Sequence, residues 1–291
     1  MITITHWDAD GIFCLYLLYK KFGTDINVYF SGPRKIENTL IKAIKENAKS
    51  EEVFITDICA TQEAIYLSSY FKKATWIDHH QWGDLEKTSR VEIIVKPYKS
   101  ASRVLSEHLT IETNLLDFID HIDSNEIQST EEEKFRDLIS AIRYCYPRSY
   151  PVWFKEIAKI LYDGKTINEI LKIHESVLNR FYEYLSKIKD SVLIRSKIYE
   201  INNNKIVIVD AENNNVPTYY IIKILDNQLG TKFDYIVVIY NNRAEIRTQT
   251  NKDVLHIAKK FGGGGHKYAA GFEIKNKSEF IEKFLALFNN T

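Results

Sequence analysis

The sequence predicts an α/β protein in which a mostly parallel sheet flanked by helices is followed by a helical connector and a smaller α/β domain with a mixed sheet. Three observations predict it. Short β-rich runs alternate with helical patterns in the N-terminal part. The middle has helical periodicity alone. The β signal then returns near residue 196, so we place the domains at 1–126, 127–195 and 196–291.

The N-terminal part alternates strand-like and helical segments in chain order. The expected strands are Ile2–Thr5, Ile26–Phe30, Val53–Thr56, Thr75–Ile77 and Val91–Val95, and the expected helices are Ile12–Phe22, Lys35–Asn47 and Thr61–Phe71. In an open parallel sheet, ligands bind beyond the carboxyl ends of the strands. Polar residues directly after these strands are therefore candidates for a site.

The remaining elements follow from periodicity and from turn residues. We expect connector helices at Glu131–Cys145 and Ile167–Lys189. Asn-rich turns predict two hairpins in the C-terminal domain, and Pro217 can open a helix. The expected strands there are Lys197–Ile201, Lys205–Val209, Asp234–Tyr240 and Ala244–Gln249, and the expected helices are Pro217–Leu229, Asn251–Lys260 and Ser278–Phe288.

Charge and cysteine content exclude several classes of protein. Lys+Arg and Asp+Glu both number 39 in 291 residues, so the formal net charge is zero. This balance argues against a sequence-independent grip on long nucleic acid. Three scattered cysteines without CxxC spacing predict reduced thiols in a cytoplasmic protein and no zinc framework. We also expect no signal peptide, no membrane span and no membrane partner.

Four polar clusters follow strand-like or helical runs in the N-terminal part. Each cluster alone is compatible with a structural turn or helix end, and Asp57 taken alone is interpreted as the N-cap of the next helix. Together they would converge on one crevice, if the strands belong to one parallel sheet. The clusters are His6-Trp7-Asp8-Ala9-Asp10-Gly11, Asp57, Asp78-His79-His80, and the pair Asp120 and Asp123.

Crowded carboxylates repel one another unless cations neutralise them. A donor set of carboxylates with one or two imidazoles and no thiolate suits Mn²⁺ or Mg²⁺, and the histidines favour Mn²⁺. The set exceeds what one such ion needs once it keeps waters. The sequence thus predicts two Mn²⁺ ions that share a bridging aspartate, with Mg²⁺ or Co²⁺ as alternatives.

The glycine distribution marks a second candidate site. Five of the 11 glycines fall between Gly262 and Gly271, in the string GGGGHKYAAGF. Successive glycines can adopt positive φ and turn their N–H groups toward an anion. The alternative is a flexible tether. The apolar residues that follow favour a packed loop.

These motifs resemble those of the DHH phosphoesterase superfamily, and the string 262–272 resembles the hallmark of its DHHA1 partner domain. Carried over, the resemblance implies that His6 and Asp8 hold one Mn²⁺. It implies that Asp10, His79 and Asp120, with Asp123 as the alternative to Asp120, hold the second. Asp57 would bridge the ions, His80 would face the scissile phosphate, and Asp78 would orient the histidines.

The resemblance also implies a substrate-binding role for the C-terminal domain. Arg247 and His266, with the run Gly262, Gly263, Gly264 and Gly265, would hold the far end of the substrate. Arg103 is a further candidate for substrate binding, with a plain surface arginine as the alternative.

The expected activity is Mn²⁺-dependent hydrolysis of short oligonucleotides. A cyclic-dinucleotide phosphodiesterase and a single-strand-specific exonuclease are the alternatives within the superfamily. A nucleic-acid-binding scaffold of a replication or repair assembly is the non-enzymatic alternative, although such proteins usually lose metal ligands. A homodimer is compatible with this prediction.

Overall fold

The computed structural model describes residues 1–47, 51–86, 88–212 and 216–289. The chain divides into two compact units, Met1–Arg180 and Phe181–Thr291. The predicted α/β class is confirmed, with a parallel sheet in the first unit and a mixed sheet in the second. The three-part division of the sequence stays a prediction.

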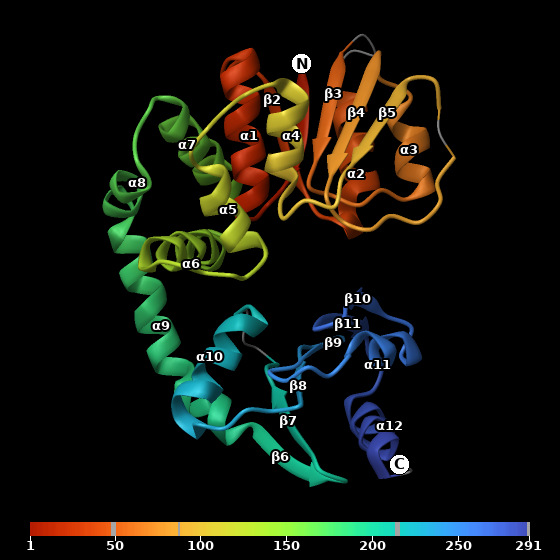
Figure 1. Cartoon of the computed structure of the whole chain (residues 1–291), viewed down its shortest axis with the longest axis vertical. Helices are drawn as coiled ribbons and strands as arrows, with labels where there is room; N and C mark the ends of the chain where they lie inside the picture. The colour runs from red at the N-terminus through yellow and green to blue at the C-terminus, as the bar shows by residue number, and fades with distance from the viewer. Residues whose placement is uncertain (48–50, 87, 213–215, 290–291) are drawn as a thin grey trace. The chain divides into compact units, whose positions relative to one another are not determined.

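The sheet of the N-terminal unit has five parallel strands in the order β2-β1-β3-β4-β5 (Figure 1). The strands are β1 (Ile2–His6), β2 (Asn27–Ser31), β3 (Glu52–Thr56), β4 (Lys73–Asp78) and β5 (Val91–Val95). From β1 the chain first adds β2 on one side of β1. It then returns and adds β3, β4 and β5 on the other side. This order places a topological switch point at the carboxyl ends of β1 and β3, where open α/β sheets bind ligands.

Helices cover both faces of this sheet. The alternating residues Ile4, Ile55 and Trp76 pack with α2 (Ile36–Glu46) and α3 (Gln62–Ser68) in one buried cluster. The opposite face is covered by α1 (Ala9–Phe22) and α4 (Ala101–Leu109), which contact each other and the strands. Because successive side chains of a strand point to opposite faces of the sheet, one side chain packs on α2 and α3 and the next packs on α1 and α4.

Four more helices follow in the same unit, and a fifth, α9, crosses into the second. They are α5 (Leu116–Asp123), α6 (Thr130–Cys145), α7 (Tyr150–Tyr162), α8 (Ile167–Ile173) and α9 (Glu175–Ile194). The single helix expected over Ile167–Lys189 is wrong, because α8 ends at Ile173 and the residue that caps it, His174, has a φ of −105° and a ψ of 18°, which depart from helical values.

The C-terminal unit contains a mixed six-stranded sheet in the order β10-β11-β9-β8-β7-β6. Its strands are β6 (Ser196–Ile201), β7 (Asn204–Asp210), β8 (Tyr235–Ile239), β9 (Arg243–Arg247), β10 (Gly264–His266) and β11 (Ala269–Glu273). Only β7 and β8 pair in parallel. The predicted turn between β6 and β7 is confirmed, with Asn202 and Asn203 at positive φ.

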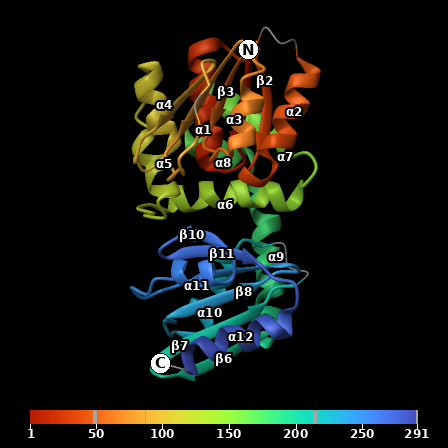
Figure 2. The ribbon, with the colours of Figure 1, turned by 90° about the vertical axis from the view of Figure 1, so that its right-hand side faces the viewer.

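One face of this sheet is covered by α11 (Leu255–Lys260) and α12 (Lys277–Asn289), which share a core with β7, β8 and β9 (Figure 2). The third helix, α10 (Thr218–Leu229), contacts β8. Asn251–Val254, which the sequence assigned to the helix before the glycines, precede α11. Within the described part of the chain, no helix is both long and apolar enough to cross a membrane.

The glycine run differs from the anion-binding loop that the sequence predicted. Gly262, at φ 75°, ends α11, and its N–H donates to the Lys259 carbonyl while that of Gly263 donates to Ala258. Gly264 and Gly265 belong to β10, which is paired with β11. The N–H groups of Gly262 and Gly263 therefore cap the helix, and Gly264 and Gly265 form part of an edge strand.

We predict opposite consequences for two neighbouring glycines. A Cβ at Gly263 would lie 2.2 Å from the Gly271 carbonyl oxygen, whereas a Cβ at Gly264 meets nothing within 4 Å. Gly263→Ala should destabilise the protein by about 1–3 kcal/mol, the usual cost of overpacking. Gly264→Ala should leave thermal unfolding unchanged, and equal melting temperatures for the two variants would contradict this packing.

Candidate metal centre

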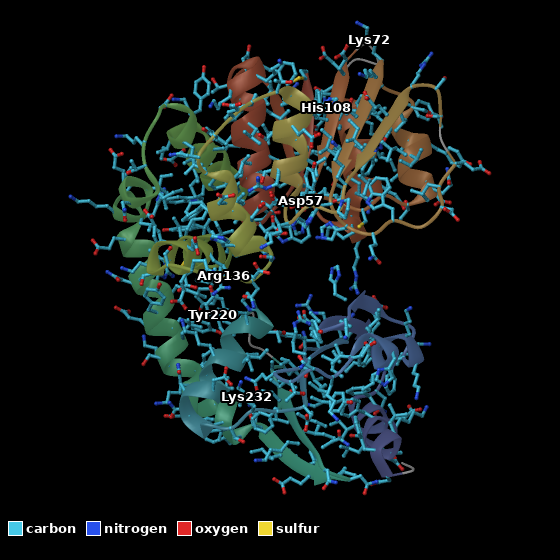
Figure 3. All side chains as sticks on the ribbon, in the orientation of Figure 1. Asp57, Lys72, His108, Arg136, Tyr220 and Lys232 are labelled. Atoms are coloured by element: carbon cyan, nitrogen blue, oxygen red, sulfur yellow. The ribbon has the colours of Figure 1, made fainter. Side chains whose placement is uncertain are left out.

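The candidate ligands gather at the carboxyl edge of the parallel sheet. His6 ends β1, Asp57 directly follows β3, and Asp78 ends β4, so three adjacent strands contribute. Figure 3 labels Asp57 among them. This is the edge that the alternation of strands and helices predicted for ligand binding.

The tight passage from β1 into α1 fixes the first motif. Asp8 caps α1, since its Oδ1 accepts a hydrogen bond from the Gly11 N–H at 3.0 Å. Gly11 lies so close to the strand that a Cβ would come within 2.2 Å of the His6 carbonyl oxygen. The Thr5 hydroxyl also donates to the Gly11 carbonyl, at 2.9 Å. His6 and Asp8 are thereby held beside each other.

Asp10 is fully buried and is bound to the N-terminus of α4. Its carboxylate accepts from the backbone N–H groups of Ala101 at 2.6 Å and Ser102 at 2.9 Å, and from the Ser102 hydroxyl at 2.5 Å. A carboxylate is favourable at a helix N-terminus. This contact ties α1 to α4 at the site.

The described residues form three groups of possible ligand atoms. Two of them each lie near one oxygen of Asp57, and the third consists of Asp57, Asp78, His79 and His80. Within each group, the atoms lie within 4.8 Å of one another. In the first, His6 Nδ1 contacts Asp8 Oδ2 and lies 3.6 Å from Asp57 Oδ2. The second consists of Asp10, His79 and Asp123. Its His79 Nε2 lies 3.7 Å from Asp57 Oδ1, so each oxygen of Asp57 faces one group.

The tautomer of His79 follows from its contacts. Its Nδ1 lies 3.1 Å from the carbonyl oxygen of Tyr98, which can only accept, so Nδ1 carries the proton. In the neutral ring, Nε2 then holds a lone pair. That nitrogen is buried, lies 3.3 Å from Asp123 Oδ2, and has no hydrogen-bond partner within the described residues. A lone pair that faces carboxylate oxygens is repulsive unless a cation lies between them.

Asp57 lies in electrostatic conflict with the carboxylates around it. Its side chain is buried, and Oδ2 has no hydrogen-bond partner in the described chain. Burial, followed by the charges of Asp8, Asp10 and Asp123, raises the pKa of Asp57 well above its usual range. The donor chemistry, the unpartnered atoms and this crowding together fit a group of divalent cations.

The backbone of Asp57 is also unusual. Its φ is 60°, in the left-handed region that few residues other than glycine occupy, and its N–H donates to the Ile77 carbonyl at 2.9 Å. The alternative that Asp57 caps the next helix is wrong, because Thr61 is the N-cap of α3. Positive φ turns the carboxylate back over the strand ends, and such backbone strain is typical of functional sites.

Asp78 organises the two histidines that follow it. One oxygen accepts from the His79 N–H at 2.9 Å and from His80 Nδ1 at 2.8 Å, and the other accepts from Trp82 Nε1 at 2.6 Å. Burial alone would raise the pKa of Asp78, but these hydrogen bonds outweigh it and the pKa is lowered. Burial would lower the pKa of His80, but Asp78 outweighs it and the pKa is raised.

The structure brings Asp123, and not Asp120, to the second group. Asp120 accepts from the Ser100 hydroxyl and from Arg103 Nε, both at 2.5 Å. Arg103 also donates to Asp117 at 2.5 Å. The preference of the sequence for Asp120 therefore disagrees with this geometry. Both aspartates lie on one helix at a spacing of three, and spacing alone could not tell which one faces His79.

The C-terminal candidates lie in the second unit. Arg247, on β9, donates to Glu245 at 3.0 Å and to the Ala270 carbonyl on β11 at 3.3 Å. Gly264, Gly265 and His266 are exposed on the edge strand β10. Gly265 needs its glycine, since φ is 137° and a Cβ would lie 2.6 Å from the Ala269 oxygen. Within the fold, Gly264 has no such steric reason.

Sequence reasoning missed the residues that support these ligands. Ser102 and the Tyr98 carbonyl each bind a candidate ligand directly, and Trp82 binds Asp78. Ser100-Ala101-Ser102 carries a signal that could have been used, because a serine ahead of an apolar helical stretch is typical of an N-cap. A backbone carbonyl such as that of Tyr98 leaves no such signal.

Known proteins are similar to this chain in sequence. Residues 202–291 match the family model of the DHHA1 domain. The chain is 26% identical over 315 aligned positions to the oligoribonuclease NrnB of Bacillus subtilis (strain 168), covering 97% of this chain and 74% of that protein.

Two solved structures share the fold along almost the whole chain. The pGpG-specific phosphodiesterase PggH from Vibrio cholerae has a TM-score of 0.66 at 18% identity, over 99% of this chain and 98% of that one. The DHH domain of a protein assigned to a family of ribosomal proteins has a TM-score of 0.70 at 18% identity, over 99% of this chain and 86% of that one.

Residues 202–291 are thus similar to the DHHA1 domain, and the chain as a whole is similar to proteins of the DHH/DHHA1 phosphoesterase superfamily. The triplet Asp78-His79-His80 lies at the end of β4. The region that matches the DHHA1 model contains the glycine run and Arg247.

We predict that Asp57→Asn stabilises the metal-free protein. Asparagine tolerates positive φ, and the neutral amide removes a buried, repelled charge. In EDTA, the free energy of unfolding should rise by about 1–3 kcal/mol, and the further stabilisation that Mn²⁺ gives the wild type should be lost. Thermal unfolding measures both effects, with the exposed Asp84→Asn as control. A variant that is less stable in EDTA and keeps the Mn²⁺ effect would contradict this account.

A second prediction separates the two aspartates of α5. Asp123→Asn should weaken Mn²⁺ binding by at least about tenfold, a loss typical even of residues that only support a ligand. Asp120→Asn should instead lower the basal stability by about 1–3 kcal/mol, because it weakens the pair between the buried Asp120 and the partly exposed Arg103, and it should keep Mn²⁺ affinity. Calorimetric titration with Mn²⁺ measures the affinities, and the reverse order would assign the ligand role to Asp120.

Proposed function

We propose that this chain is a metal-dependent phosphodiesterase that hydrolyses short oligonucleotides with two Mn²⁺ ions. The observation that carries the proposal is the buried carboxylate of Asp57, whose oxygens face two separate groups of ligand atoms. A structural aspartate would pair its buried oxygens with donors. Asp57 instead faces other carboxylates and an unpartnered imidazole nitrogen.

The residues on the two sides of Asp57 would hold one ion each. His6 and Asp8 would hold the first, and Asp10, His79 and Asp123 the second, with Asp57 shared. Bound there, divalent ions supply positive charge for the phosphate oxygens and an activated water as nucleophile. The mixture of carboxylates and imidazoles favours Mn²⁺, with Mg²⁺ and Co²⁺ as alternatives.

The chain itself supplies orientation and a further positive charge. Asp78 binds His80 Nδ1 and raises the pKa of the ring, so that Nε2 can present a proton to the substrate. We assign His80 to the scissile phosphate, where it would offset the negative charge that develops in the transition state. The Tyr98 carbonyl keeps His79 in the tautomer that leaves Nε2 available as a ligand.

Short oligonucleotides are the substrate that the comparisons favour. The oligoribonuclease NrnB aligns with 97% of this chain, and the similar structure of PggH belongs to a protein specific for a dinucleotide. The zero net charge fits a short substrate better than a long one. Linear or cyclic dinucleotides are the second candidate, and a single-strand exonuclease is the third. A non-catalytic scaffold would have no need of the unpartnered ligand atoms around Asp57.

Activity measurements test the proposal and rank the substrates. The panel is a dinucleotide, a short RNA, a short DNA, a cyclic dinucleotide and polyphosphate, each with Mn²⁺. His79→Ala should lower kcat by at least about a hundredfold, while His108→Ala, an exposed histidine of the same unit, should retain wild-type activity. Wild-type hydrolysis by His79→Ala, or hydrolysis of polyphosphate alone, would refute the proposal.

We also propose that Arg247 and the edge strand Gly264–His266 hold the far end of the substrate. Gly264 has no packing reason to be glycine, which suits a backbone approached by a ligand. Arg247→Ala should raise KM for a dinucleotide by about tenfold, the loss expected for one charge-assisted hydrogen bond. Mn²⁺-induced stabilisation should stay at the wild-type value, and a defect confined to metal affinity would contradict the assignment.

A further inference from the structure

A pocket of about 490 Å³ adjoins the second ligand group within the N-terminal unit. It is formed by the segment that follows β5, the first turn of α4 and one side of α5. Its walls include Tyr98, Lys99, Arg103, Asp117 and His121. The volume lies in the range of small-molecule sites in proteins.

Two contacts connect this pocket to the candidate metal centre. The backbone carbonyl of Tyr98 binds His79 Nδ1 at 3.1 Å. Asp120, in the pocket wall, lies one helical turn before Asp123 and is bound to Ser100 at the start of α4. These contacts place the pocket beside the second ligand group.

The charges on the walls compensate one another. Arg103 is paired with Asp117 and Asp120, and Lys99 is paired with Glu126, all at 2.5 Å. His121 Nδ1 lies 2.9 Å from Glu132. Each cation thus has a carboxylate partner, so a phosphate would meet no uncompensated positive charge here.

The remaining wall chemistry suits a flat, neutral and polar group. Tyr98 is 38% exposed, and its ring has Lys96 Nζ over one face, 5.7 Å from the centroid, so that the opposite face is the one that a ligand can use. Arg103 adds a planar guanidinium, and the highly exposed Asp117 adds acceptors at the rim. Aromatic rings and guanidinium planes are the surfaces on which proteins stack nucleobases, while neighbouring donors and acceptors bind the base edges.

We propose that this pocket receives a nucleobase of the substrate, stacked on Tyr98 with its edge against Arg103 and Asp117. The proposal rests on the proposed function for the position of the scissile phosphate. The pocket proposal extends the proposed function because it names the place where the N-terminal unit recognises the base. The walls contain none of the proposed metal ligands, so base binding needs no metal.

Nucleoside binding in EDTA tests the pocket independently of catalysis. Ligand-observed NMR should detect adenosine, guanosine, cytidine or uridine bound to the wild type and to Tyr66→Ala. Binding should be lost in Tyr98→Ala. Tyr66 is a matched control, because both tyrosines are exposed and each hydroxyl donates to a glutamate at 2.7 Å. Equal binding by the two variants, or binding of ribose 5-phosphate but of no nucleoside, would overturn the proposal.

Kinetics with a dinucleotide and its abasic analogue supply the second test. Tyr98→Ala should raise KM for the dinucleotide by about tenfold, within the range measured for loss of one base–aromatic stack. KM for the abasic analogue should stay unchanged, and Tyr98→Phe, which keeps the ring, should behave as wild type. An equal rise for both substrates would overturn the proposal. Absence of hydrolysis of either substrate would refute the proposed function, and the nucleoside titration would still decide on the pocket.

A variant at the rim keeps the test valid if Tyr98→Ala fails to fold. The side chain of Asp117 is 83% exposed, so its removal spares the core. Asp117→Ala should change the ratio of kcat/KM among dinucleotides of different bases at least about threefold, since a base-edge contact discriminates by this much or more. An unchanged ratio would overturn the role of Asp117 in base recognition.

Discussion

The buried carboxylate of Asp57 is the constraint on which the rest of the N-terminal site depends. It lies at the switch point of the sheet, at positive φ, among carboxylates that repel it. Taken alone, this arrangement costs stability, because a buried charge without a partner is expensive. We interpret the surrounding residues as a cage that holds these carboxylates close together so that cations can bind between them.

The cage is built from the backbone as much as from side chains. Gly11 lets α1 start against the end of β1, and the N-terminus of α4 holds both oxygens of Asp10. Asp78 fixes His80 and the backbone of His79, while the Tyr98 carbonyl fixes the ring of His79. Each ligand is therefore oriented by a rigid element, which limits the reorganisation that binding and chemistry require.

The sequence predicted the order of strands and helices well, because their alternation and the polar residues at strand ends are local patterns. It also predicted the clusters around His6, Asp57 and His79. It could not choose between Asp120 and Asp123, since both share one helix face and only the contact with Arg103 separates them. It did not show that Gly262 and Gly263 bond back to α11, because glycines that follow a helix end or lie close to another strand look the same in sequence as glycines of an anion-binding loop.

The most direct test of the two-ion account is titration of the metal-free protein with Mn²⁺, followed by electron paramagnetic resonance. The account predicts two ions per chain whose signal is weakened by magnetic coupling, because Asp57 would be shared between them. In Asp57→Asn, the coupling should disappear. One ion per chain, or two ions with the full uncoupled signal in the wild type, would contradict the account.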